Sequence, residues 1–321
     1  MDFTLYLAWS GATVSDALLE FFDLPDALDE IALIAIALGL LAALIRPLQV
    51  IYRRNGTGAI AGFGRVGVKT GSVDRLRELH ALLYTWIAGA HPERRIWHSQ
   101  WLSVKDLYHD LRPVLPTLRG QLVDVGCYGK PYAKWLTGIQ SHVGLDVTPG
   151  ETVDHVIRDG ERWPLESSAF QSVLCTQVLQ VVKDVPHLVN EIDRVLEVGG
   201  IAVVTTPFFY NDMSIDQGRG VYKDYWRHSF YGAQEIFRER FEILDVKAQG
   251  GFGSTAGVML LNWLHKSMSR SSISEFLMIA LLPFWLLLCL IVNAAGWLFD
   301  KLDGTGAFYH NVLLVLRKKA L

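Results

Sequence analysis

The fold of this 321-residue chain is decided by the stretch 122-LVDVGCYG-129, in which an apolar run ends in Asp124 and a glycine turn. A second apolar run, 142-HVGLDV-147, ends in another acid, Asp146, twenty-two residues after the first. The pair predicts neighbouring parallel strands, with a tight turn after the first and an acid at the tip of the second that can hold ribose hydroxyls. We therefore expect an α/β fold with a nucleotide site at these strand ends.

Outward from this stretch, apolar runs alternate with helical patterns, which predicts a mainly parallel sheet covered on both faces. The expected strands are 121–125, 142–147, 153–157, 172–176, 201–205, 241–246 and, near the end of the chain, 312–316. A helix with apolar residues from Leu188 to Leu196 is expected to be capped by Gly199-Gly200. Upstream, helical spacing is expected over 73–90, and a helix within 97–118 should pack on the edge of the sheet domain.

The N-terminal region combines an acidic start with an apolar segment. Residues 1–30 hold seven acids and no Lys or Arg, 31–45 carry no charged or polar side chain, and basic residues follow from Arg46. This pattern predicts a transmembrane helix over about 31–52 with the remainder of the chain in the cytoplasm, at the cytoplasmic (inner) membrane. A buried core helix is the alternative.

A second apolar segment, Phe276 to Phe299, is twenty-four residues long, uncharged and interrupted by Pro283. A single crossing there would separate the last strand from its sheet. We therefore expect a re-entrant helical hairpin bent near Pro283 or helices lying in the membrane interface, with a packed core insertion as the alternative. The expected domains are 1–55 (membrane helix), 56–118 (linker and helical lead-in), 119–255 with 306–321 (sheet domain) and 256–305 (hydrophobic insertion).

Charge and cysteine content exclude several classes. The net charge of −3 gives no electrostatic sign of a nucleic-acid partner. The three cysteines are far apart, so they predict neither a metal site nor a disulfide framework. The sequence indicates no oligomeric state.

Several blocks resemble class I methyltransferases that use S-adenosylmethionine, over about 120–250 and the last strand. Residues 122–132 resemble the first motif of the family, residues 142–147 the second, residues 159–170 the third and residues 191–200 its helix-and-turn block. Residues 206–208 and 224–227 resemble elements of bacterial members that modify glycans or lipids. The resemblance implies a Rossmann-like seven-stranded sheet, with the last strand antiparallel between the fifth and sixth. It also implies S-adenosylmethionine as the cofactor.

Carried over residue by residue, the resemblance places the cofactor at the strand tips. Asp146 would accept from the ribose hydroxyls, Asp124 from the amino group and Asp159 from the adenine amine, while Gly126 lets the backbone approach closely. As alternatives, Asp124 is a capping acid, Asp146 an ordinary strand-end acid and Asp159-Gly160 a simple turn. The cofactor-binding candidates are Asp124, Gly126, Cys127, Tyr128, Gly129, Asp146, Val147, Asp159, Gly160 and Gln177.

For catalysis we expect His228 as the base, with Asp224 orienting it or replacing it, and Arg227 holding an acidic group such as a phosphate. The family departures are Tyr128 in place of a glycine and Gln180-Val181 in place of Glu-His. The expected activity is methyl transfer to a membrane-resident lipid or lipid-linked saccharide. The alternatives are an anchored enzyme acting on a soluble small molecule or glycan, and a non-catalytic membrane scaffold.

Overall fold

A computed structural model describes residues 72–214, 223–268 and 279–320. The predicted N-terminal transmembrane helix and the loop after it lie outside the described residues. The chain divides into two compact units, one comprising residues up to Gly89 with Ser271–Trp285, and the other Ala90–Arg270 with Leu286–Leu321. We call the second one the sheet unit. Within the first unit, helix α4 spans Ser72–Ala88, where a helix over 73–90 is predicted.

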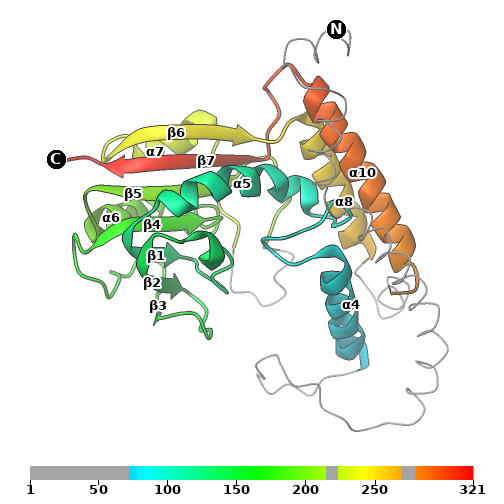
Figure 1. Cartoon of the computed structure of the whole chain (residues 1–321), viewed down its shortest axis with the longest axis horizontal. Coiled ribbons are helices and arrows are strands. Elements are labelled where there is room, and N and C mark those ends of the chain that lie inside the picture. The colour runs from blue at the N-terminus through cyan, green and yellow to red at the C-terminus, as the bar shows by residue number, and fades with distance from the viewer. Residues whose placement is uncertain (1–71, 215–222, 269–278, 321) are drawn as a thin grey trace. The chain divides into compact units, whose positions relative to one another are not determined.

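The sheet unit is built on seven strands in the order β3-β2-β1-β4-β5-β7-β6 (Figure 1). Strands β1 to β5 run parallel, and β7 pairs antiparallel with both β5 and β6. The predicted antiparallel position of the last strand is therefore confirmed. The bounds are β1 Gly120–Val125, β2 Ile139–Asp146, β3 His155–Val156, β4 Phe170–Thr176, β5 Leu196–Pro207, β6 Phe241–Gln249 and β7 Asn311–Lys318.

Helices cover both faces of the sheet, because alternate strand residues point to opposite sides. On one face, α6 (Val185–Val195) and α7 (Phe230–Phe237) pack on residues such as Val123, Val173 and Val204. On the other face, α5 (Trp101–Val114) and the short helix η1 (Leu115–Thr117) pack on Leu122, Leu174 and Leu313. The helix predicted within 97–118 is thus present as α5, and Figure 1 shows it lying across the sheet.

The predicted glycine cap of α6 is wrong. Helix α6 ends at Val195 and β5 begins at Leu196, so Gly199 and Gly200 lie inside the strand. The register with β4 shifts there, from Leu196 opposite Phe170 to Ile201 opposite Ser172. Gly199 supplies the positive φ of 82° that the irregularity requires. Strand β3 has two residues, shorter than the predicted 153–157.

A helical insertion separates β6 from β7, as predicted. It contains α8 (Phe252–Met268) and α10 (Leu282–Leu302), whose first four residues fall in the other unit. A Cβ added to Gly253 would lie 2.0 Å from the carbonyl oxygen of Gly296, so glycine is required where these helices meet. Pro283 stands in the first turn of α10, where its missing N–H is no loss. In the described chain, α10 is the one helix long and apolar enough to cross a membrane.

Candidate functional site

The loop after β1 turns sharply across the ends of β1 and β2. Gly126 has φ 69°, and a Cβ there would come within 2.5 Å of Val178. The N–H groups of Gly126 and Cys127 both donate to the carbonyl oxygen of Leu145, at 2.8 and 3.1 Å. Tyr128 and Lys130 also have positive φ, 45° and 47°. Left-handed backbone at non-glycine residues is costly, and it is found where a functional geometry demands it.

Asp146 ends β2 and holds this loop from the side. Its Oδ2 accepts from the N–H of Tyr128 at 3.1 Å, and its Oδ1 accepts from the N–H of Thr148 at 2.9 Å. The side chain of Tyr128 itself is 84% exposed, and Val147 after Asp146 is also exposed. The acid predicted at the strand tip therefore lies against the glycine turn, as the two motifs require.

Asp124 lies within the sheet unit and is buried. Its Oδ2 is 2.9 Å from Nε2 of His142 on β2. Burial raises the pKa of Asp124, the bond to His142 opposes this, and the charge of Asp146 adds to the rise. The two carboxylates are therefore close enough to repel each other.

Cys127 and Gly129 complete the turn. Burial raises the pKa of Cys127 to about 11, so its thiol stays protonated and fills space beside Gly144. A Cβ at Gly129 would meet no atom within 4 Å, so Gly129 lies in open space.

Asp159 and Gly160 lie in the loop after β3, and both are exposed. Oδ2 of Asp159 accepts from the N–H of Lys183 at 3.0 Å. This bond ties the loop after β3 to the loop after β4. Gly160 has φ 78°, as the turn interpretation of this pair also expects.

Gln177 follows β4 with a positive φ of 57°. Its N–H donates to the carbonyl of Thr205 at 2.9 Å. Its side-chain Nε2 donates to Oγ1 of Thr205 at 3.1 Å and to Oδ1 of Asn311 at 2.8 Å. The residue is thus fixed by both β5 and β7 next to the glycine turn.

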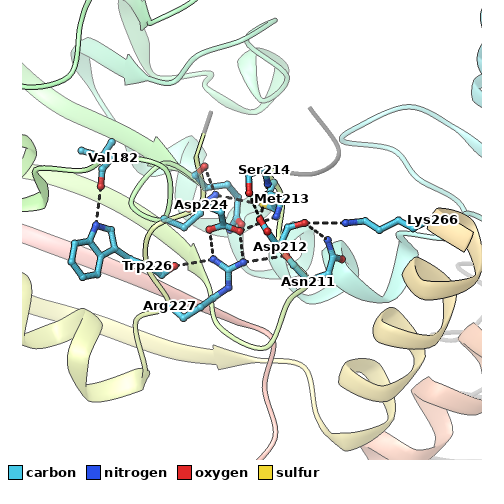
Figure 2. Close-up of polar contacts among 11 residues, drawn as sticks. Val182, Asn211, Asp212, Met213, Ser214, Asp224, Trp226, Arg227 and Lys266 are labelled. Carbon is cyan, nitrogen blue, oxygen red and sulfur yellow. Dashed lines mark hydrogen bonds and ion pairs between the residues drawn. The ribbon is translucent and has the colours of Figure 1, made fainter. Parts of the chain in front are cut away.

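Two segments after β5, residues 208–214 and 223–229, form what we call the acceptor-side loops. Figure 2 shows Arg227 and Asp224 facing each other there as a bidentate ion pair. Asp224 also accepts from the N–H of Met213 at 2.9 Å, and Arg227 donates to the carbonyl of Asn211 at 3.1 Å. In the described chain, Asp224 makes no hydrogen bond to His228, so it does not orient that ring as expected. Arg227 has its charge matched internally, so it is not an open phosphate-binding group.

His228 is partly buried in these loops. Its ring stacks on Trp226 with centroids 6.3 Å apart, and its Nε2 has no hydrogen-bond partner among the described residues. Burial lowers the pKa of His228, so the imidazole is neutral near pH 7. A neutral ring with an uncommitted nitrogen is what a general base needs.

Sequence reasoning missed the residues that organise this edge. Gln180 is fully buried; its Nε2 donates to the carbonyl of Gln177 at 2.8 Å, and its Oε1 has no partner in the described chain. From α8, Asn262 donates to Asn211, and Lys266 donates to the carbonyl of Asp212 at 2.9 Å. Only the departure from Glu-His at Gln180 was visible in the sequence.

The chain matches known proteins as follows. A family model described as a methyltransferase domain matches residues 123–204, from β1 into β5. No curated protein sequence matches the chain.

Solved structures with similar folds include three of stated identity. The [4+2]-cyclase SpnF is 22% identical, with 67% of this chain and 82% of that chain covered and a TM-score of 0.43. An S-adenosylmethionine-dependent methyltransferase from Mesorhizobium loti is 17% identical (68% and 100% covered, TM-score 0.41). Geranyl diphosphate C-methyltransferase from Streptomyces coelicolor A3(2) is 14% identical (67% and 80% covered, TM-score 0.41). At these values the likenesses carry no argument about activity.

The family match covers the strands whose tips carry the glycine turn, Asp146 and Gln177. The sheet order also agrees with the one that the motifs imply. Residues 123–204 of the chain therefore match a methyltransferase domain.

Proposed function

We propose that this enzyme transfers the methyl group of S-adenosylmethionine to an acceptor that resides in a membrane, a lipid or a lipid-linked saccharide. The observation that carries the proposal is the direct hydrogen bonding of α8, through Asn262 and Lys266, to the acceptor-side loop at Asn211 and Asp212. An apolar insertion is thus connected to the edge of the sheet where the acceptor would enter.

The strand tips fit the cofactor by the chemistry of their donors and acceptors. Asp146 offers carboxylate oxygens for the ribose hydroxyls, the bare turn at Gly126 lets the backbone come close, and exposed Val147 offers an apolar contact for the adenine. Asp159 and Gly160 lie exposed in the next loop, at the adenine end. When bound, the cofactor supplies an electrophilic methyl group on a sulfonium.

Asp124 is buried beneath the strand ends. Because it is 3% exposed and bonded to His142, we assign it to positioning the strand ends through charge and hydrogen bonding. Cys127 stays a neutral thiol, and Tyr128 reaches the site with its backbone N–H while its ring remains free to cover a ligand.

On the acceptor side, we assign His228 as the base for an acceptor hydroxyl; its Nε2 is buried and has no hydrogen-bond partner among the described residues, so the acceptor must reach it by a local opening of these loops. Asp224 and Arg227 hold the two acceptor-side loops together by their ion pair (Figure 2). The ion pair thereby fixes the shape of the loops that the acceptor would contact, and proximity supplies much of the rate.

The insertion suits a bilayer surface. Large apolar side chains are exposed on both helices of the insertion: Met259, Leu260 and Trp263 on α8, and Leu287, Leu288, Ile291, Leu298, Phe299 and Leu302 on α10. The most apolar window of α10 has a mean hydropathy of 2.0, and only 33% of it is buried. Because β6 and β7 are paired in one sheet, the chain between them must return to the side it left. A hairpin that dips into one leaflet or lies in the interface satisfies this condition.

The test uses the full chain in native membranes with methyl-labelled S-adenosylmethionine, followed by extraction with organic solvent. Label in the lipid fraction supports the proposal, and label confined to the aqueous phase removes the membrane-resident acceptor in favour of a soluble one. Trp263→Glu on α8 should reduce lipid labelling at least severalfold. Leu244→Glu, at an exposed apolar position on β6, is the matched control and should leave it unchanged.

A non-catalytic scaffold predicts a different result. Calorimetry with S-adenosylhomocysteine separates the two ideas, because an enzyme binds this product in the micromolar range. Absence of binding would favour the scaffold and contradict the proposed function.

A further inference from the structure

A chain of three side-chain amides, two of them buried, runs through the sheet unit from the tip of β4 to helix α5. Gln177 Nε2 donates to Oδ1 of Asn311 on β7, Asn311 Nδ2 donates to Oε1 of Gln249 on β6, and Gln249 Nε2 donates to Oδ2 of Asp110 on α5 at 2.7 Å. Asn311 and Gln249 are 3% and 2% exposed, so water does not compete for these bonds. We call Gln177, Asn311 and Gln249 the amide chain.

Asp110 sets the direction of every bond in the amide chain. Its carboxylate also accepts from Nζ of Lys247 at 2.9 Å, and a carboxylate in an ion pair only accepts hydrogen bonds. Gln249 must then turn its NH₂ toward Asp110 and its oxygen toward Asn311. Asn311 must in turn present its NH₂ to Gln249 and its oxygen to Gln177.

The direction of these bonds fixes the orientation of the Gln177 amide at the tip of β4. Gln177 must face Asn311 with its NH₂ group, which leaves Oε1 as the polar atom pointing away from the amide chain. The hydroxyl of Thr205 can donate or accept, so it does not decide the orientation. Gln177 is partly exposed and precedes Val178, the residue packed against the turn at Gly126.

We propose that Asp110, Gln249 and Asn311 are positioning residues that make Gln177 present its carbonyl oxygen to the sulfonium end of the cofactor. The inference rests on the proposed cofactor site. A carbonyl oxygen attracts a positively charged sulfonium, whereas an NH₂ group in the same place repels it. The amide chain therefore favours the charged methyl donor over the neutral product.

Asp110→Asn reverses the chain with almost no change in volume. Lys247 donates to the side-chain oxygen of the new asparagine, so the NH₂ group of that asparagine faces Gln249. Each following amide must then flip, exchanging its oxygen and its NH₂ group, because otherwise two NH₂ groups would face each other. Reversal gives up only the long bond from Gln249 to the carbonyl of Asp106, at 3.3 Å.

The measurement is the ratio of the dissociation constants of S-adenosylhomocysteine and S-adenosylmethionine, obtained by calorimetry on the full chain. Asp110→Asn should lower this ratio about fivefold, the order of one net hydrogen bond. Asp106→Asn, one turn earlier on α5, is the control and should leave the ratio unchanged, because the Asp106 side chain makes no bond to the amide chain.

Two further variants test the proposal if Asp110→Asn fails to fold. Gln177→Met removes the oxygen at a partly exposed position and should lower the ratio similarly. The double variant Asp110→Asn with Gln249→Glu moves the carboxylate one link along the chain, restores the original direction and should recover most of the ratio.

An unchanged ratio in folded Asp110→Asn, or in Gln177→Met, would overturn the inference. A wild-type protein that binds neither compound would instead contradict the proposed function. The two failures are thus distinguishable in one titration series.

Discussion

The carboxylate of Asp146 at the end of β2 accepts a hydrogen bond from the N–H of Tyr128 in the loop after β1, at 3.1 Å. One strand thereby holds the turn that follows its neighbour. The acid shapes the turn, and in the proposed cofactor site it also offers oxygens to the ribose.

Asp146→Asn should weaken S-adenosylhomocysteine binding by about tenfold, because the amide has one acceptor instead of two and no charge. Asp154→Asn is the control, since Asp154 also accepts from a β2 backbone N–H, that of Gly144, and pairs with Lys130. Calorimetry on both variants checks this. Equal losses at the two positions would contradict a ribose contact at Asp146.

Gly126→Ala should destabilise the fold by about 2 kcal/mol, because a Cβ there meets Val178 at 2.5 Å and φ is 69°. Gly129→Ala, with nothing within 4 Å of its Cβ, should stay within about 0.5 kcal/mol of wild type. Thermal unfolding measures both. Adding Val178→Ala to Gly126→Ala should recover the part due to the clash, and no recovery would mean that backbone strain alone is responsible.

Arg227→Lys should lower methyl transfer by about tenfold while leaving cofactor affinity unchanged, because lysine cannot form the bidentate pair with Asp224. The bond to the carbonyl of Asn211 would be lost as well. Label transfer and calorimetry, run side by side, separate the two effects. Arg158→Lys, in the exposed pair with Glu161, is the matched control, and an equal effect there would refute a specific role.

Acid should destabilise the sheet unit through its buried histidines. Burial lowers the pKa of His98 to about 3 and of His91 to about 4, from 6.5. Below pH 6.5 these histidines bind protons in the unfolded chain but stay neutral in the folded chain. The free energy of unfolding therefore falls as the pH drops toward the two lowered pKa values. Each histidine contributes a slope of about 1.4 kcal/mol per pH unit.

His98→Asn should remove one of these slopes. The new side-chain oxygen can replace Nδ1 of His98, which accepts from the N–H of Gln100 at 2.9 Å. Denaturant unfolding at pH 7, 6 and 5 measures the difference. A variant whose stability falls as steeply as that of wild type would show that His98 does not titrate as described.

The sequence predicted the strands and the glycine turn because both are local patterns repeated in order along the chain. The acids at 124 and 146 follow apolar runs, and the backbone brings such strand ends together whatever the side chains do elsewhere. The family resemblance supplied the antiparallel last strand.

The remaining features depend on contacts between distant residues. Gly199-Gly200 after a helical pattern predicts a helix C-cap. In the structure the pair instead accommodates a register shift between β5 and β4, which depends on the partner strand and cannot be predicted from the local sequence. The amide chain joins residues 110, 177, 249 and 311, which packing alone brings together. Asp224 and His228 are close in sequence, but Asp224 pairs with Arg227, which forms a bidentate ion pair with it, and not with His228.

The position of β7 determines when the sheet can be completed during synthesis. This strand lies between β5 and β6 and bonds to both, yet the ribosome makes it only after α8 and α10. The catalytic sheet therefore stays open along β5 until the insertion has been synthesised. The seven-stranded sheet can therefore be completed only after synthesis has passed the apolar helices α8 and α10.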